Sequence, residues 1–129
     1  MALLVLDASV VIALLDEKDA HHERALASIE ATREDDKVIP ASSFAEVLVV
    51  PQRAGDRAVQ EFERNLADVP VRIESVTPDV ARRAAALRAR HAALRLADAL
   101  VLATAEVLGA TVLTADGAWP RYSRRVRVI

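Results

Sequence analysis

A short apolar run that stops at a carboxylate is the feature that most constrains how this chain can fold. Residues 2–6 are apolar and have the length of a buried strand, and Asp7, Ala8 and Ser9 follow before a second apolar stretch. In an open parallel sheet, ligands bind in the crevice beyond the carboxyl ends of the strands. Asp7 is therefore predicted to lie at a ligand-binding edge, although capping of the following helix is an open alternative.

The composition predicts one compact domain that spans residues 1–129. The hydrophobic share of 53% is ample for a core, whereas aromatic residues make up 3%, which argues against an aromatic platform for stacking on bases. The chain has no cysteine, which excludes disulfides and thiolate metal sites. This usage fits a reducing cytoplasm, where we expect the protein to reside.

Charge is unevenly distributed along the chain. The net charge is −2, but residues 1–36 carry −6 and residues 37–129 carry +4. Nearly all of the basic residues are arginines, which suit bidentate contacts with phosphate; a solvated, arginine-rich surface is the alternative. The apolar start of the chain is too short to span a bilayer, so no membrane association is expected.

Strand and helix patterns alternate along the whole chain. Strands are expected at 2–6, 37–40, 69–73, 111–113 and 124–129, the last as an edge strand. Helices are expected at 9–15, 20–32, 42–50, 54–67, 78–91 and 96–108, with Pro51 closing the third and Gly109 ending the last. Such alternation predicts an α/β fold with a mostly parallel sheet covered by helices on both faces.

Three further acidic residues occupy informative positions. Asp98 lies in the middle of the apolar stripe of its helix, where a carboxylate needs a partner, a proton or a metal; structural pairing with an arginine is the alternative. Glu46 follows Ser43 at the spacing of a capping box, and Asp116 opens an Asp-Gly turn just after a strand. Each has a structural explanation, so none identifies a site alone.

Together with Asp7, these acids suggest a cation site. Carboxylates about 5 Å apart repel by roughly 3 kcal/mol per pair at an effective dielectric constant near 20, so such a cluster is tolerable when cations occupy it. Oxygen ligands without cysteine select hard ions such as Mg²⁺ or Mn²⁺. These ions can orient a phosphodiester and activate water, which points to phosphoryl hydrolysis. Ser9 and Thr114 each add a hydroxyl at the same expected edge.

The chain resembles the PIN-domain ribonucleases, and among them the VapC-type toxins of bacterial toxin–antitoxin pairs. The resemblance covers essentially the whole chain and rests on four segments in register, which are Leu6–Ser9, Ser43–Val47, Leu96–Ala105 and Leu113–Asp116. It implies a three-layer α/β/α fold with a roughly five-stranded sheet. It also implies an endoribonuclease that uses Mg²⁺ or Mn²⁺, forms a homodimer, and is silenced by a cognate VapB-like antitoxin.

The resemblance further assigns roles to individual residues. It implies an acidic catalytic site of Asp7, Glu46, Asp98 and Asp116, in which the three aspartates are metal ligands and Glu46 is a ligand or orients the nucleophile. Thr114 and Ser9 would support the metal-activated water. Many relatives have a further acid shortly after the last aspartate, but Gly117 follows here, so the number of metal ions is left open. The candidates for holding the RNA backbone are Arg53, Arg57, Arg121, Arg124 and Arg125.

One alternative belongs to a different functional class. A PIN-like fold can serve as a protein-binding or RNA-binding module without turnover. The intact set of four acids argues against that interpretation, and a metal titration would discriminate between the two, because a binding module needs no carboxylate-dependent Mn²⁺ site.

Overall fold

Five parallel strands form a single sheet in the computed structural model, which describes residues 2–129. The order across the sheet is β3-β2-β1-β4-β5, and every neighbouring pair is parallel. This confirms the predicted parallel sheet and places the first strand at its centre. The strands are β1 (Leu3–Leu6), β2 (Asp36–Pro40), β3 (Arg72–Glu74), β4 (Thr111–Thr114) and β5 (Val126–Val128).

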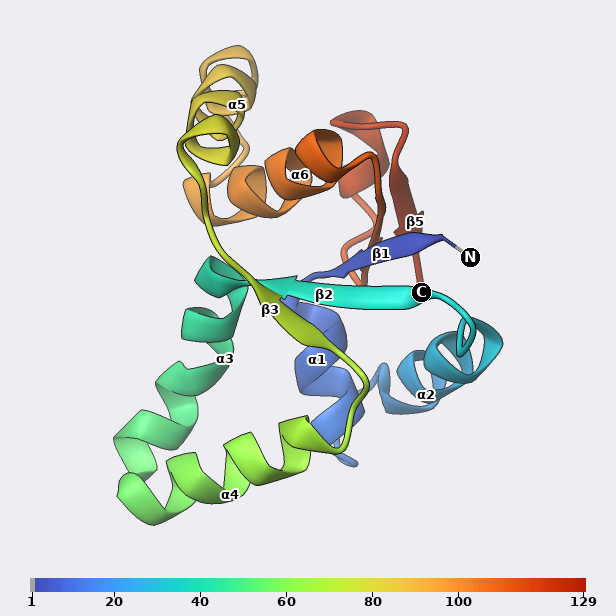
Figure 1. Ribbon diagram of the computed structural model, residues 1–129, viewed down its shortest axis with the longest axis vertical. Coiled ribbons are helices and arrows are strands. Elements are labelled where there is room, and N and C mark those ends of the chain that lie inside the picture. Colours follow the sequence, from blue (N-terminus) through green and yellow to red (C-terminus); the bar gives the residue numbers. More distant parts are fainter. Residues whose placement is uncertain (1) are drawn as a thin grey trace.

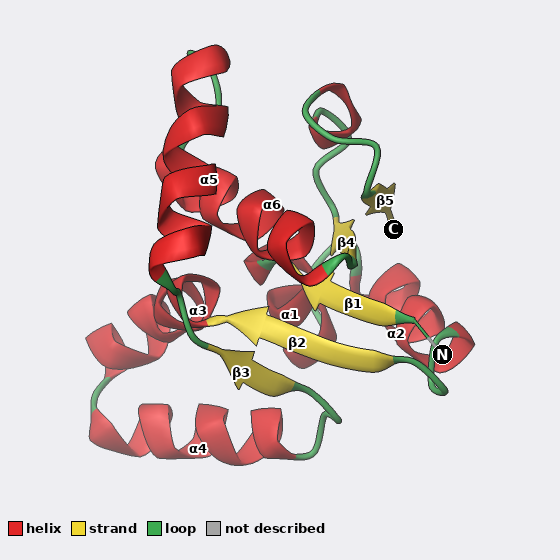
Figure 2. Ribbon diagram, turned by 45° about the horizontal axis from the view of Figure 1, so that its top comes forward, coloured by secondary structure: helices red, strands yellow, loops and turns green. Residues whose placement is uncertain are grey.

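Six α-helices cover the two faces of the sheet within residues 2–129 (Figures 1 and 2). Four lie on one face, namely α1 (Ala8–Leu15), α2 (His22–Ala31), α3 (Ala41–Ala54) and α4 (Asp56–Ala67). The other face carries α5 (Pro78–Arg90) and α6 (Leu96–Leu108), and a short 3₁₀ helix, η1 (Trp119–Arg121), precedes β5. In the described part of the chain, no helix has the length and apolar character needed to cross a membrane.

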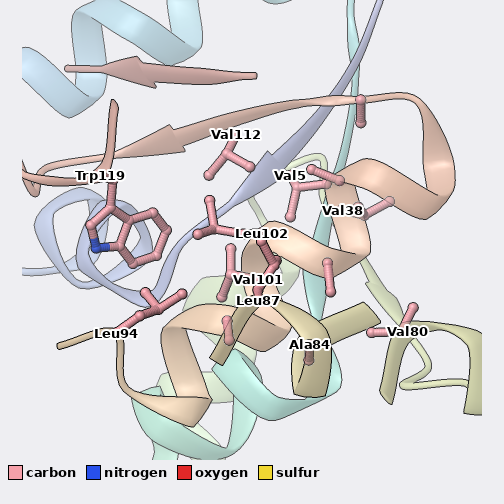
Figure 3. Close-up of a cluster of buried hydrophobic side chains, with 14 residues drawn as sticks. Val5, Val38, Val80, Ala84, Leu87, Leu94, Val101, Leu102, Val112 and Trp119 are labelled. Atoms are coloured by element: carbon pink, nitrogen blue, oxygen red, sulfur yellow. The ribbon is translucent and has the colours of Figure 1, made fainter. Parts of the chain in front are cut away.

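The core is divided in two by the sheet, as the alternation of side chains along a strand requires. Leu4 and Leu6 of β1 pack on the side of α1 and α3. Val5, between them, joins a second cluster with Leu102 of α6 and Trp119 (Figure 3). Because β1 is buried on both faces, its sequence is continuously apolar rather than alternating.

The start and end of α3 differ from the sequence-based expectation. The helix begins at Ala41, so Ser43 lies inside its first turn; its hydroxyl is buried and has no hydrogen-bond partner in residues 2–129. The capping-box explanation for Glu46 is therefore wrong.

Pro51 does not close the helix, which continues to Ala54. Gly55 stops it because its φ of 112° is open to glycine and strained for other residues.

Other boundaries agree more closely with the sequence. The Thr77 hydroxyl accepts a hydrogen bond from the Val80 N–H at 3.2 Å, so α5 starts where the Thr-Pro-Asp pattern predicted. Gly109 ends α6 in the left-handed conformation, with φ 65°. The third strand starts later than predicted, at Arg72, because the Val69 N–H closes the end of α4 by bonding the Leu66 carbonyl.

Candidate active site

The four predicted acids come from different elements of the fold. Asp7 follows the last residue of β1, and Asp116 lies two residues beyond β4. Glu46 lies in the second turn of α3, which starts directly after β2, and Asp98 is the third residue of α6. Since α6 packs against β1, β4 and α3, its first turn is held close to the end of the central strand.

Asp7 is buried and held by two hydroxyl groups. The side chains of Ser9 and Thr114 donate hydrogen bonds to its Oδ2 atom at 2.7 and 2.9 Å. Asp7 occupies the N-cap position of α1, but its side chain makes no capping hydrogen bond within residues 2–129. The capping alternative is therefore wrong, and the two hydroxyls fix the orientation of the carboxylate instead.

Burial and mutual repulsion perturb the acids of this site. Burial raises the pKa of Asp7, the hydroxyls of Ser9 and Thr114 oppose that rise, and the charge of Asp98 adds to it. Burial also raises the pKa of Glu46, with further repulsion from Asp7 and Asp98 and partial relief from Arg95. The structure therefore brings Asp7, Glu46 and Asp98 within electrostatic reach of one another, as a cation site requires.

Asp98 is already paired with an arginine from its own helix start. The Arg95 side chain donates two hydrogen bonds, from Nε to Oδ2 at 3.2 Å and from one terminal nitrogen to Oδ1 at 3.0 Å. The Asp98 side chain is 14% exposed, whereas that of Arg95 is 71% exposed. The structural pairing left open by the sequence is thus present, and Arg95 is a site residue that the sequence analysis did not name.

Asp116 joins the site through its backbone. Its N–H donates to the Thr114 hydroxyl at 3.1 Å, and the Ala115 N–H donates to the Ser9 hydroxyl at 3.0 Å. The exposed Asp116 carboxylate accepts a hydrogen bond from the Ala118 N–H at 2.9 Å, within its own turn. Ser9 and Thr114 therefore tie the Asp116 turn to Asp7, while the Asp116 carboxylate bonds within the turn.

The five candidate arginines are exposed and lie outside the acid cluster. Arg53 is the next-to-last residue of α3, about two helical turns beyond Glu46, and Arg57 is the second residue of α4. Arg121 is in η1. Arg124 and Arg125 precede β5, and the Arg125 carbonyl accepts from the N–H of Val112 in β4, so both lie away from the carboxyl edge.

Comparison with known families identifies the fold. The family model described as PIN domain matches residues 4–125. The chain belongs to the PIN domain family. A search of curated protein sequences found no significant match.

Solved structures similar to this PIN domain include toxins from toxin–antitoxin systems. A Klebsiella pneumoniae toxin–antitoxin complex has 23% identity and a TM-score of 0.76, with 96% of this chain and 95% of the other covered. VapC20 of Mycobacterium tuberculosis, described as a sarcin–ricin loop cleaving toxin, has 24% identity, a TM-score of 0.73, and coverage of 92% and 93%. FitAcB of Neisseria gonorrhoeae has 21% identity, a TM-score of 0.73, and coverage of 98% and 96%. At these identities the likeness shows the shared fold.

The donor atoms of this PIN domain suit a hard divalent cation, but their present arrangement is not a complete metal cage. Asp7, Glu46 and Asp98 offer carboxylate oxygens, which Mg²⁺ and Mn²⁺ prefer. Among residues 2–129, no group of three or more acidic or histidine side chains is arranged to hold a metal ion. Two of the acids are engaged elsewhere, since Asp98 is paired with Arg95 and the Asp116 carboxylate accepts a hydrogen bond within its own turn.

Proposed function

We propose that this PIN domain is a metal-dependent endoribonuclease and the toxin of a toxin–antitoxin pair. The observation that carries the proposal is the convergence of Asp7, Glu46 and Asp98 from β1, α3 and α6. Burial raises the pKa values of Asp7 and Glu46, and repulsion from the neighbouring acids adds to both rises. A purely structural site has no need of acids whose charged forms are disfavoured by burial and by neighbouring carboxylates. The similarity in fold to toxins, one of them described as a sarcin–ricin loop cleaving toxin, supports the same activity.

Asp7, Asp98 and Asp116 are the proposed ligands of Mg²⁺ or Mn²⁺. A divalent ion in this position supplies positive charge to the scissile phosphate and lowers the pKa of water. Asp7 is oriented for this role because Ser9 and Thr114 fix its Oδ2 atom. Glu46 is a further ligand or orients the attacking water; its raised pKa also suits it to accept a proton from that water.

The remaining residues would hold the RNA and the partner. Arg53 and Arg57, on the α3–α4 hairpin, are proposed to bind the RNA backbone. Arg121, Arg124 and Arg125 would contact RNA at a distance from the cleaved bond, given their place outside the acid cluster. We further propose a homodimer that acts in the cytoplasm and is inhibited by a cognate VapB-like antitoxin, in line with the complexes in which related folds were crystallised.

A nuclease assay on total cellular RNA tests the proposal. Purified protein, free of partner, is incubated with Mg²⁺, Mn²⁺ or EDTA, beside the variants Asp7→Asn and Asp98→Asn. We expect discrete, metal-dependent cleavage that falls more than about a hundredfold in both variants. Asp79→Asn is the matched control, because Asp79 also pairs with an arginine three residues away but lies exposed on α5.

The outcomes separate the enzyme from the binding module. Cleavage that survives EDTA or both substitutions would contradict the proposed site. No cleavage in any metal, with RNA from the source organism and a protein shown to be folded, would favour a module that binds RNA or protein without turnover.

A further inference from the structure

Arg95 is an unfavourable residue for its position in the helix. It is the N-cap of α6, with φ −69° and ψ 150°, and its side chain makes no capping hydrogen bond within residues 2–129. Serine, threonine, aspartate and asparagine are preferred there because they satisfy the free N–H groups of the first turn. A cation also opposes the positive end of the helix dipole. Arginine at this position is therefore explained by what its side chain does in the site rather than by helix capping.

The contact of Arg95 with Asp98 involves both oxygens of the carboxylate. The two hydrogen bonds reach both carboxylate oxygens, so the guanidinium lies across the open side of the group. A metal ion approaching the same oxygens would meet the positive charge of the guanidinium. Because the Arg95 side chain is 71% exposed, it can rotate into solvent without disturbing the core, whereas Asp98 at 14% exposure stays in place.

The charge of Arg95 acts on the rest of the acid cluster as well. It opposes the rise in the pKa of Glu46, and the carboxylates of Asp98, Glu46 and Asp7 in turn raise the pKa of Arg95 itself. The guanidinium therefore neutralises part of the negative charge that a cation at the centre of the cluster would neutralise. A metal ion and Arg95 would neutralise the same three acids.

We propose that Arg95 is a built-in competitor of the divalent cation for Asp98, so that metal binding requires the Arg95–Asp98 pair to open. The inference rests on the proposed function, since it concerns the regulation of that same metal site. Its consequence is that the chain binds metal more weakly than its carboxylates alone would allow. The paired state also lowers repulsion among the acids when no metal is bound.

A second ion pair in the chain provides a matched control. Arg82 and Asp79 of α5 are also three residues apart and form a bond of 2.9 Å, but both are more than 70% exposed. They share a surface pocket with Val107, near the end of α6. Val107 is nine residues beyond Asp98, or about 13 Å along the helix, so removing Arg82 changes the same kind of pair away from the acid cluster.

The experiment is a titration with Mn²⁺ alone, without RNA, read by calorimetry and by the electron paramagnetic resonance signal of free Mn²⁺. The wild-type protein is compared with Arg95→Ala, Arg95→Lys, Arg82→Ala and Asp7→Asn. We expect Arg95→Ala to bind Mn²⁺ about fivefold or more tightly than the wild type. The Mn²⁺ affinity of Arg95→Lys should lie between those of the wild type and Arg95→Ala, because lysine keeps the charge but cannot form the bidentate contact. Arg82→Ala should match the wild type.

The outcomes distinguish this inference from the proposed function. If the wild type binds Mn²⁺ through Asp7, and Arg95→Ala binds it equally or more weakly, Arg95 does not compete and the inference is overturned while the metal site stands. If neither protein binds Mn²⁺, the metal site fails and the inference fails with it. Binding by Arg95→Ala alone would be the strongest form of the expected result.

Discussion

Two ionisable side chains are buried at opposite ends of neighbouring strands, and their surroundings differ in kind. Lys37 lies near the start of β2 and is 2% exposed, and Asp7 follows the end of β1 and is 8% exposed. The Lys37 ammonium donates to the backbone carbonyls of Thr32 and Asp35, both in the turn before β2. Asp7 accepts two hydroxyl hydrogen bonds on one oxygen and faces two other acids.

The comparison shows that burial of a charge does not by itself indicate function. Lys37 closes a turn, since neutral carbonyls that need donors surround its ammonium group. Asp7 is oriented by two hydroxyls, yet burial raises its pKa and the like charge of Asp98 adds to that rise. Lys37 is surrounded by carbonyl groups that accept its hydrogen bonds, whereas Asp7 lies near other carboxylates. We therefore expect Lys37 to contribute to stability and Asp7 to catalysis.

The largest expected effect is on RNA cleavage. Asp7→Asn should reduce it more than about a hundredfold, whereas Lys37→Met should leave it within about twofold, because Lys37 lies at the other edge of the sheet. The measurement is the initial rate of cleavage in Mg²⁺ at a temperature where both variants are folded. A large loss in Lys37→Met would show that the two ends of the sheet are coupled.

The two substitutions should have the opposite order of effect on the stability of the fold, where Lys37→Met is the more damaging. Lys37→Met keeps the buried stem of the side chain but leaves the Asp35 carbonyl without its donor, so we expect a loss of about 1–3 kcal/mol in urea unfolding. Asp7→Asn should raise Tm by a few degrees in metal-free buffer, because it removes a charge that burial and Asp98 disfavour. The asparagine oxygen can still accept both hydroxyls at the Oδ2 position. A lower Tm for Asp7→Asn would make Asp7 a structural residue like Lys37.

The effect on Tm should also depend on pH. The pKa of Asp7 is raised in the folded protein, so its ionised form costs stability above the folded pKa, and this cost disappears as the pH falls below the ordinary value near 3.8. The advantage of Asp7→Asn should therefore be larger at pH 7.5 and shrink toward pH 4. Melting curves across that range, in EDTA, check the sign. An advantage that grew on acidification would contradict the raised pKa.

The fold could be predicted from the sequence because each element has its own local pattern. The alternation of apolar strand runs with helical stripes specified a parallel sheet, and the positions just after strands specified the edge that carries Asp7 and Asp116. The predicted start and end of α3 were wrong, because the tertiary structure overrides local sequence preferences there. Proline is tolerated in the last turns of α3, and Ser43 is buried inside the first turn rather than capping it.

The contacts of the site could be predicted less well than its position. Asp98 was recognisable because a carboxylate interrupts an apolar stripe, but the pairing with Arg95 depends on a rotamer that no sequence pattern specifies. The available signal was an arginine three residues before the acid, at a helix start where arginine is disfavoured. Likewise, the burial of Lys37 depends on how the turn before β2 folds over it.

The smallest effects should come from the two hydroxyls that orient Asp7. Thr114→Val and Ser9→Ala each remove one hydrogen bond to Oδ2, and we expect cleavage to fall about tenfold in each. Both hydroxyls lower the pKa of Asp7, so their loss raises it further. The acidic limb of the pH–rate profile should then move to higher pH in both variants, whereas a merely structural loss would lower the rate equally at every pH. Thr114→Ser, which keeps the hydroxyl, is the control and should restore the position of that limb.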